Sequence, residues 1–241
     1  WDGIAEKYAK QPIRQQKAYE IKLDLTREYF TPESNVLEFG CGTGSTAILH
    51  APYVQHIDAI DVSPEMIRIA RDKLAPEQVT NVQFEVADMD SFQTQPSTYD
   101  AALGLNILHL LDNRMAAMGR VFEALKPGGY FVSSTMCLRE KLLFRLMEPL
   151  FPVMHTIGQW PRVRRFSASR LQQDIEDIGF KTVPEFRFIR HAGLLVQSRA
   201  ARDTCMIKLH GLYLSIRRSD RNCRNFKGTY TKLYELAGDL L

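Results

Sequence analysis

Short apolar runs alternate with longer amphipathic stretches along the middle of the chain, between residues 35 and 136. The runs are rich in Val, Ile, Leu, Phe and Ala and end in turn residues, which is typical of strands buried on both faces of a sheet. The stretches between them repeat apolar positions every three or four residues, as helices with one buried face do. This pattern predicts strands at 36–39, 54–60, 82–86, 99–105 and 130–135.

Strands that alternate with helices in this way predict an α/β fold with parallel strands. A further helix is expected to begin after Ser167 and to stop at Gly179, and strands at 186–189 and 194–197 are expected to form a closing hairpin. We therefore predict a doubly wound, mostly parallel, seven-stranded Rossmann-like sheet with helices on both faces. In such sheets ligands bind beyond the carboxyl ends of the strands.

The segments outside this alternation define the predicted domain organisation. Residues 1–34 predict two helices separated by Pro12, and residues 137–166 predict an amphipathic helix followed by a basic loop. We predict one main domain over 1–200, in which 137–166 is a lid-like insertion. Residues 201–241 are expected to form a basic, helical extension.

Charge is distributed unevenly between the two halves of the chain. Residues 1–136 carry 12 Lys and Arg against 18 Asp and Glu, whereas residues 137–241 carry 19 against 10. A basic half suits an anionic substrate, a nucleic acid or a membrane surface, and a solvated basic surface is the simpler alternative. Within the extension, 206–216 follows neither period and 230–241 predicts a helix. A homodimer contact, a membrane-surface helix and a covering tail all remain open for it.

The overall composition is that of a soluble globular protein, with 45% apolar and 24% charged residues. No apolar run approaches the ~18 residues of a membrane span, and the first residues do not have the pattern of a signal peptide. The four cysteines form no C-x-x-C pair. We therefore predict no metal site, no disulfide framework and a cytoplasmic location.

The first strand ends in a glycine-rich turn, Gly40-Cys41-Gly42-Thr43-Gly44, and a helix is predicted directly after it. A strand, a glycine turn and a helix bring backbone N–H groups close to a nucleotide-like ligand. The usual dinucleotide fingerprint has its third glycine three positions after the second, where this chain has Ser45. The displaced third glycine is evidence against a nicotinamide-dependent oxidoreductase, which remains an alternative.

Polar side chains follow the other predicted strands at the same edge of the sheet. Asp61 ends the second strand, 21 positions after Gly40, close to the ~20 expected of an acid that binds ribose hydroxyls. Asp88 follows the third strand, and Asn106 and His109 follow the fourth. The alternatives are a helix N-terminal acid for Asp61 and a turn residue for Asp88.

The segment Glu38-Phe-Gly-Cys-Gly-Thr-Gly44 resembles the first motif of class I S-adenosylmethionine-dependent methyltransferases. The resemblance extends over about residues 1–200, through Asp61, Asp88, the 99–106 strand and Lys126-Pro-Gly-Gly. The opening Asp-Gly-Ile-Ala-Glu-Lys-Tyr is similar to that of quinone-type and other small-molecule methyltransferases.

This resemblance implies S-adenosyl-L-methionine as the cofactor and a small-molecule methyl acceptor. In the family, the glycine turn approaches the methionine part, the acid after the second strand takes the ribose hydroxyls and the acid after the third meets the adenine amino group. The cofactor-binding residues implied here are Tyr8, Glu38, Gly40, Cys41, Gly42, Gly44, Asp61, Val62, Met66, Asp88, Met89 and Asn106. For Cys41 the backbone is the expected contributor, and core packing is the alternative for Tyr8 and Met66.

Methyl transfer requires alignment of nucleophile, methyl group and sulfur, and a general base only if the acceptor must lose a proton. His109 is the candidate base, with a structural histidine on an apolar run as its alternative. His155 and Tyr213 are further candidates. Arg162, Arg164 and Arg165 are candidates for pairing an anionic group of the acceptor, and an exposed basic loop is their alternative.

The acceptor site is expected between the N-terminal helices and the 137–166 insertion, whose Leu, Met and Phe content suggests an apolar or amphipathic small molecule. Nucleic-acid methylation is disfavoured, because Asn106-Ile-Leu-His109 replaces the Asn/Asp-Pro-Pro-aromatic motif of amino-methylating DNA enzymes. The chain also has no aromatic-rich basic stripe for stacking single strands. A non-catalytic, cofactor-binding scaffold remains an alternative.

Overall fold

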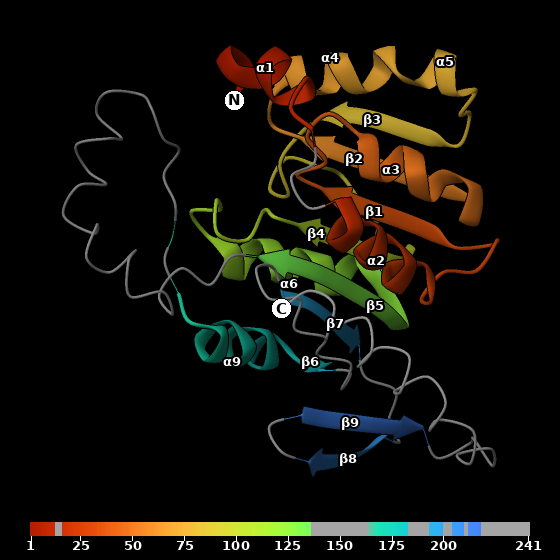
Figure 1. The fold of residues 1–241 in the computed structure, drawn as a ribbon. Coiled ribbons are helices and arrows are strands. Elements are labelled where there is room, and N and C mark those ends of the chain that lie inside the picture. Colours follow the sequence, from red (N-terminus) through yellow and green to blue (C-terminus); the bar gives the residue numbers. More distant parts are fainter. Residues whose placement is uncertain are drawn as a thin grey trace.

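Five parallel strands form the centre of the fold in a computed structural model of the chain (Figure 1). In sheet order they are β3 (Val82–Val86), β2 (His56–Asp61), β1 (Asn35–Phe39), β4 (Tyr99–Leu105) and β5 (Leu125–Thr135). The chain runs outward from β1 to β3 and then crosses to β4, so the strand order reverses between β1 and β4. This arrangement confirms the predicted parallel, doubly wound sheet.

The structure describes residues 1–12, 16–135, 164, 166–182, 193–199, 204–209 and 212–217. Several sequence predictions lie outside these residues. They are the helix predicted within 137–166, most of the basic loop there, the strand at 186–189 and the helix at 230–241. The candidate residues His155, Arg162 and Arg165 also lie outside them.

Two further strands continue the sheet beyond β5. Strand β7 (Gly193–Arg199) pairs antiparallel with β5, and β6 (Phe180–Thr182) pairs antiparallel with β7. The sequence predicted a hairpin in which 194–197 pairs with 186–189. In the described part of the chain, the partners of β7 are instead β5 and β6. Strands β8 (Thr204–Leu209) and β9 (Leu212–Arg217) form a separate antiparallel pair.

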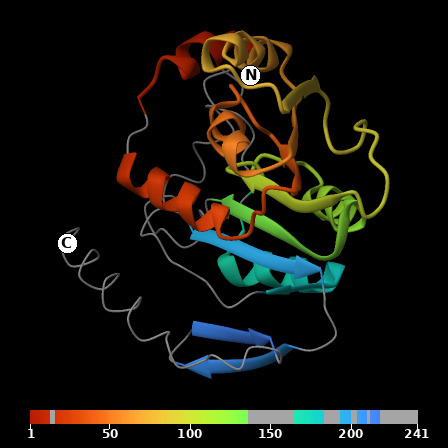
Figure 2. The same ribbon diagram turned by 90° about the vertical axis from the view of Figure 1, so that its right-hand side faces the viewer.

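The helices cover both faces of the sheet, as predicted (Figure 2). Because strand side chains alternate in direction, Leu37 and Phe39 pack with residues of α6 and α9, whereas Val36 packs with residues of α2, α3 and α4. The bounds of the main helices are α1 (Ala5–Ala9), α2 (Gln16–Arg27), α3 (Ser45–His50), α4 (Pro64–Asp72), α6 (Arg114–Ala124) and α9 (Ala168–Ile178). The short elements are η1 (Asp2–Ile4), η2 (Ala51–Tyr53) and α5 (Leu74–Glu77).

The helix caps follow the sequence closely. Ser63 accepts a hydrogen bond from the backbone N–H of Met66 at the start of α4, and Ser167 accepts one from Arg170 at the start of α9. Gly179 ends α9 in the left-handed conformation, with φ of 108°. Among the helices of the described ranges, none combines the length and the apolar character needed to cross a bilayer.

The fifth strand begins earlier than predicted. The sequence suggested that 126–129 stops a helix before a strand that starts at Tyr130, but β5 starts at Leu125. The pairing with β4 shifts here: Tyr99 faces Leu125 and Ala101 faces Tyr130. The extra residues of β5 therefore form an irregularity inside the strand rather than a loop before it.

Gly44 ties the glycine turn to the core, and its substitution should destabilise the fold. A Cβ at Gly44, whose φ is +73°, would lie 2.5 Å from Cζ of Phe84 and 2.7 Å from Cβ of Ala70. We expect Gly44→Ala to lower the free energy of unfolding by about 2–4 kcal/mol, through left-handed strain and overpacking. Urea denaturation followed by circular dichroism measures this change.

Gly119 provides the matched control, because it lies within α6 and a Cβ there would meet nothing within 4 Å. Gly119→Ala should leave stability unchanged or raise it by up to about 1 kcal/mol. Equal effects of the two substitutions would contradict the assigned role of Gly44.

Candidate functional site

A cavity of about 410 Å³ opens at the carboxyl ends of β1, β2, β3 and β4, where the strand order reverses. Its volume is within the range of small-molecule sites, and its position is the one expected for a doubly wound sheet. The cavity brings together most of the predicted cofactor-binding residues. Those that line it are Tyr8, Glu38, Gly40, Cys41, Gly42, Asp61, Val62, Met66, Asp88, Met89 and Asn106.

The carboxylate of Asp61 joins the tip of β1 to the tip of β2. Its Oδ2 accepts a hydrogen bond of 2.9 Å from the backbone N–H of Gly42, and its Oδ1 accepts one of 2.9 Å from the N–H of Ser63. A carboxylate has about four acceptor positions, so both oxygens keep capacity for further donors. Asp61 therefore fixes the glycine turn and can still bind hydroxyl groups of a ligand.

The glycine turn presents bare backbone to the cavity at Gly42. Its φ is +54°, and a Cβ placed there would meet only Cε1 of Tyr8, at 4.0 Å. A side chain at this position would therefore extend into the cavity, besides being strained. Gly44 does not line the cavity, because its missing side chain makes room for core packing instead.

Glu38 carries its carboxyl group into the cavity from β1 and is 2% exposed. Its Oε2 is buried without a hydrogen-bond partner among the described residues. Burial, and secondarily the negative charge of Asp61, raises the pKa of Glu38 to about 8. The carboxyl group of Glu38 is therefore largely protonated at neutral pH.

Asp88 is held in a local turn. Its Oδ1 accepts hydrogen bonds from the hydroxyl and the backbone N–H of Ser91, both 2.7 Å long, and from the N–H of Asp90 at 3.0 Å. The Ser91 hydroxyl is the main cause that lowers the pKa of Asp88. The turn role named as its alternative is thus present, although the residue also lines the cavity.

Three further residues line the cavity: Met66, Cys41 and Asn106. Met66 is 3% exposed and packs with Ala5 of α1 while it also lines the cavity. Burial raises the pKa of the Cys41 thiol, so it stays protonated, and the backbone N–H of Cys41 is already bonded to the oxygen of Ile60. Asn106 has a left-handed backbone with φ of 59°, a strained conformation that occurs preferentially at functional sites.

His109 does not line the cavity. It is 4% exposed, its Nδ1 lies 3.0 Å from Oγ1 of Thr135, and burial lowers its pKa. Its role as a general base stays a prediction. The guanidinium of Arg164, predicted to pair an acceptor anion, instead pairs with Asp112, with Nη2 2.6 Å from Oδ1.

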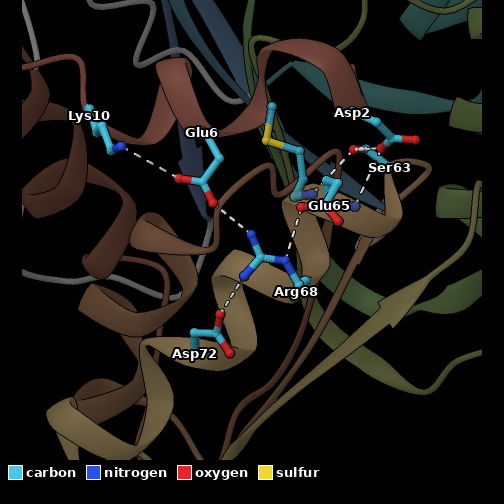
Figure 3. Close-up of polar contacts among 8 residues, drawn as sticks. Asp2, Glu6, Lys10, Ser63, Glu65, Arg68 and Asp72 are labelled. Atoms are coloured by element: carbon cyan, nitrogen blue, oxygen red, sulfur yellow. Dashed lines mark hydrogen bonds and ion pairs between the residues drawn. The ribbon is translucent and has the colours of Figure 1, made fainter.

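Helix α1, which carries Tyr8 to the cavity, is attached to α4 by a polar network (Figure 3). The carboxylate of Asp2 accepts a hydrogen bond from the hydroxyl of Ser63, and Glu6 forms a 2.6 Å ion pair with Arg68. Arg68 also pairs with Glu65 and Asp72 within α4. Each exposed pair contributes at most about 1 kcal/mol, so the buried contact of Ala5 with Met66 and Ile69 carries much of the attachment.

Sequence reasoning missed several cavity-lining residues because their signal was ordinary. Tyr19 and Lys22 lie three positions apart on α2 and looked like part of an amphipathic helix. Ile107, Leu110 and Leu111 belong to an apolar run after β4, which by itself indicates only core packing. A lysine on an otherwise apolar helix face was the one available clue.

The raised pKa of Glu38 should make the protein less stable as pH rises. Below about 4.5, the ordinary value, Glu38 is protonated in both the folded and the unfolded chain. Between pH 4.5 and about pH 8 the unfolded chain loses this proton whereas the folded protein keeps it. The free energy of unfolding therefore falls as the pH rises through this range. We expect Glu38→Gln to remove this part of the slope in denaturant titrations across that range. Glu85→Gln, at an exposed position of β3, is the control; equal slopes in wild type and Glu38→Gln would refute the assignment.

Comparison with known proteins places these features in a family. Residues 36–129, which include the glycine turn, Asp61, Asp88 and β4, match the family described as a methyltransferase domain. Demethylmenaquinone methyltransferase of Leptospira interrogans is 34% identical over 120 residues, which cover 46% of this chain and 48% of that protein. The chain thus spans about half the length of the curated relatives it matches.

Solved structures share the fold. The YcgJ protein of Bacillus subtilis superposes with a TM-score of 0.60 at 22% identity, covering 68% of this chain and 69% of that one. Geranyl diphosphate C-methyltransferase of Streptomyces coelicolor, solved with S-adenosyl-L-homocysteine, has a TM-score of 0.61 at 12% identity and covers 77% and 80%. These comparisons show a methyltransferase domain over residues 36–129 and a Rossmann-like methyltransferase fold.

Proposed function

We propose that this protein transfers a methyl group from S-adenosyl-L-methionine to a small apolar or amphipathic acceptor, a reaction of the EC 2.1.1 type. The observation that carries the proposal is the cavity in which Asp61 fastens the open glycine turn. An acid and a glycine turn that carries no side chain over its backbone, at one sheet edge, are features that a nucleoside with an amino-acid tail requires.

The protein's own residues mainly bind and orient. Asp61 offers two oxygens to the vicinal hydroxyls of a ribose, a bidentate match, while Gly42 leaves room for the chain that leads away from the sugar. When bound, the cofactor supplies an activated methyl group. The buried surroundings of Glu38 and Cys41 exclude water from the region beside it.

The apolar character of the acceptor is supported by the cavity wall at the carboxyl end of β4. Leu105, the last residue of β4, and Ile107, Leu110 and Leu111 after it line the cavity and offer aliphatic surface with no charged group. The Leptospira relative is named for methylating demethylmenaquinone, an acceptor consistent with such a wall. The seven-stranded sheet as the complete core, the domain over 1–200, the cytoplasmic location and a homodimer stay predictions.

Asp61→Ala should weaken cofactor binding. Loss of the carboxylate removes charged hydrogen-bond acceptors, each worth about 1.5–3 kcal/mol, so the affinity for S-adenosylhomocysteine in isothermal titration should fall at least tenfold. Circular dichroism checks that the variant remains folded. Glu85→Ala, an exposed acid on the neighbouring strand, should bind like wild type, and an unchanged affinity of Asp61→Ala would contradict the ribose role.

The class of cofactor can be tested directly. Isothermal titration of the full chain should detect binding of S-adenosylhomocysteine and none of NAD. Binding of NAD alone would refute the proposal, since the glycine turn would then serve a dinucleotide. Transfer of a labelled methyl group to fractionated small molecules identifies the acceptor.

A further inference from the structure

Lys73 connects the end of α4 to the glycine turn. It follows Asp72, the last residue of the helix, and is half-buried. Its Nζ donates a 2.7 Å hydrogen bond to the backbone oxygen of Thr43 and a 3.0 Å one to Oγ of Ser45. A lysine at the C-terminus of a helix commonly interacts with the last carbonyls of that helix. Lys73 instead reaches 30 positions back in the sequence, to the turn that borders the cavity.

The backbone of the glycine turn depends on hydrogen bonds, because glycine itself restricts it little. Gly44 has a φ of +73°, and glycine adopts positive and negative φ about equally well. The peptide group between Thr43 and Gly44 is held on both sides. Its N–H donates a 3.1 Å hydrogen bond to the oxygen of Cys41, and its oxygen accepts the bond from Lys73. Because a peptide group is planar, these two bonds together fix its rotation.

The ammonium of Lys73 is committed to the turn rather than to a carboxylate. The neighbouring Asp72 pairs with Arg68, and among the described residues no acid forms an ion pair with Lys73. Burial lowers the pKa of Lys73, so its ammonium is partly withdrawn from solvent. A hydrogen bond from a charged donor is stronger than one from a neutral donor. Lys73 therefore holds the turn firmly from α4, whereas Asp61 holds it from β2.

We propose that Lys73 is a positioning residue for cofactor binding, which keeps the glycine turn in its binding conformation by holding the oxygen of Thr43. The proposal rests on the proposed function, since it assumes that S-adenosylmethionine binds against this turn. Lys73 itself does not line the cavity, so it acts through Thr43 and Ser45, which do. A ligand then meets a turn that is already ordered, and less entropy is lost on binding.

Arg71 provides the matched control, because it ties the end of α4 to β3 and not to the turn. Its Nη2 and Nε donate hydrogen bonds of 2.6 and 3.2 Å to the backbone oxygen of Phe84. Replacement of Lys73 or of Arg71 by Met thus removes a basic side chain and two hydrogen bonds from the same end of one helix. In Arg71→Met the ladder with β2 still holds Phe84, which pairs with Ala59. Urea denaturation measures the loss of stability in both variants.

Two measurements on the full chain test the proposal. Without ligand, hydrogen–deuterium exchange at the amides of 41–45 should be faster in Lys73→Met than in wild type, because the turn opens more often. Exchange there should be unchanged in Arg71→Met. In isothermal titration, Lys73→Met should bind S-adenosylhomocysteine about five- to thirtyfold more weakly than wild type, whereas Arg71→Met should bind it like wild type.

Unchanged exchange or unchanged affinity in Lys73→Met would overturn the inference. Equal losses of affinity in the two variants would also overturn it, because the effect of Lys73 would then be one of general stability. Each of these results leaves the proposed function intact. Failure of the wild-type chain to bind S-adenosylhomocysteine would instead refute the proposed function.

Discussion

The hydrogen bonds of the Asp61 carboxylate hold the functional edge of this protein together. Asp61 accepts from Gly42 at the tip of β1 and from Ser63 at the start of α4. These bonds connect two adjacent strands, the glycine turn and a helix N-terminus through a single side chain. Since charge-assisted hydrogen bonds are stronger than neutral ones, the turn is positioned before a ligand arrives. Such preorganisation reduces the entropy that binding must otherwise cost.

Two buried titratable side chains, Glu38 and Lys22, line the cavity beside this link. Glu38 lies close enough to Asp61 for the two negative charges to oppose each other, which contributes to the raised pKa of Glu38. Lys22 lies in the same cavity without an ion pair in the described part of the chain. Such buried groups lower stability when they are unpaired, and natural proteins retain them chiefly at functional sites.

The remaining walls differ in chemistry and in attachment. The loop after β4 contributes aliphatic side chains, whereas α1 contributes Tyr8 from a helix attached to α4 by exposed ion pairs (Figure 3). Exposed pairs are weak and sensitive to salt, whereas the strands beneath the cavity are fixed by continuous ladders. The cavity thus lies on firmly paired strands, whereas its α1 side is attached by weaker contacts. The proposed methyl transfer would need both, because the reacting atoms must be held in line and the cofactor must still be exchanged.

The order of strands and helices was determined by the sequence, because alternating apolar runs and helix caps are local signals. The strands at 82–86 and 99–105 and the caps at Ser63 and Ser167 were predicted at the residues where the structure has them. The glycine motif and Asp61 were also recognisable, since both follow directly from the strand ends they occupy. The hairpin β8–β9 was missed because its apolar stretch follows neither period.

Tertiary structure decided which candidates reach the cavity and in what state. Gly44 belongs to the same motif as Gly42, yet its missing side chain makes room for Phe84 rather than for a ligand. His109 follows β4 as Asn106 does, but it packs against Thr135 outside the cavity wall. Lys22 on α2 and Glu38 on β1 line the same cavity because the helix packs beside the strand. Sequence specifies local conformation, whereas direction, burial and the pairing of charges depend on distant segments that only folding brings together.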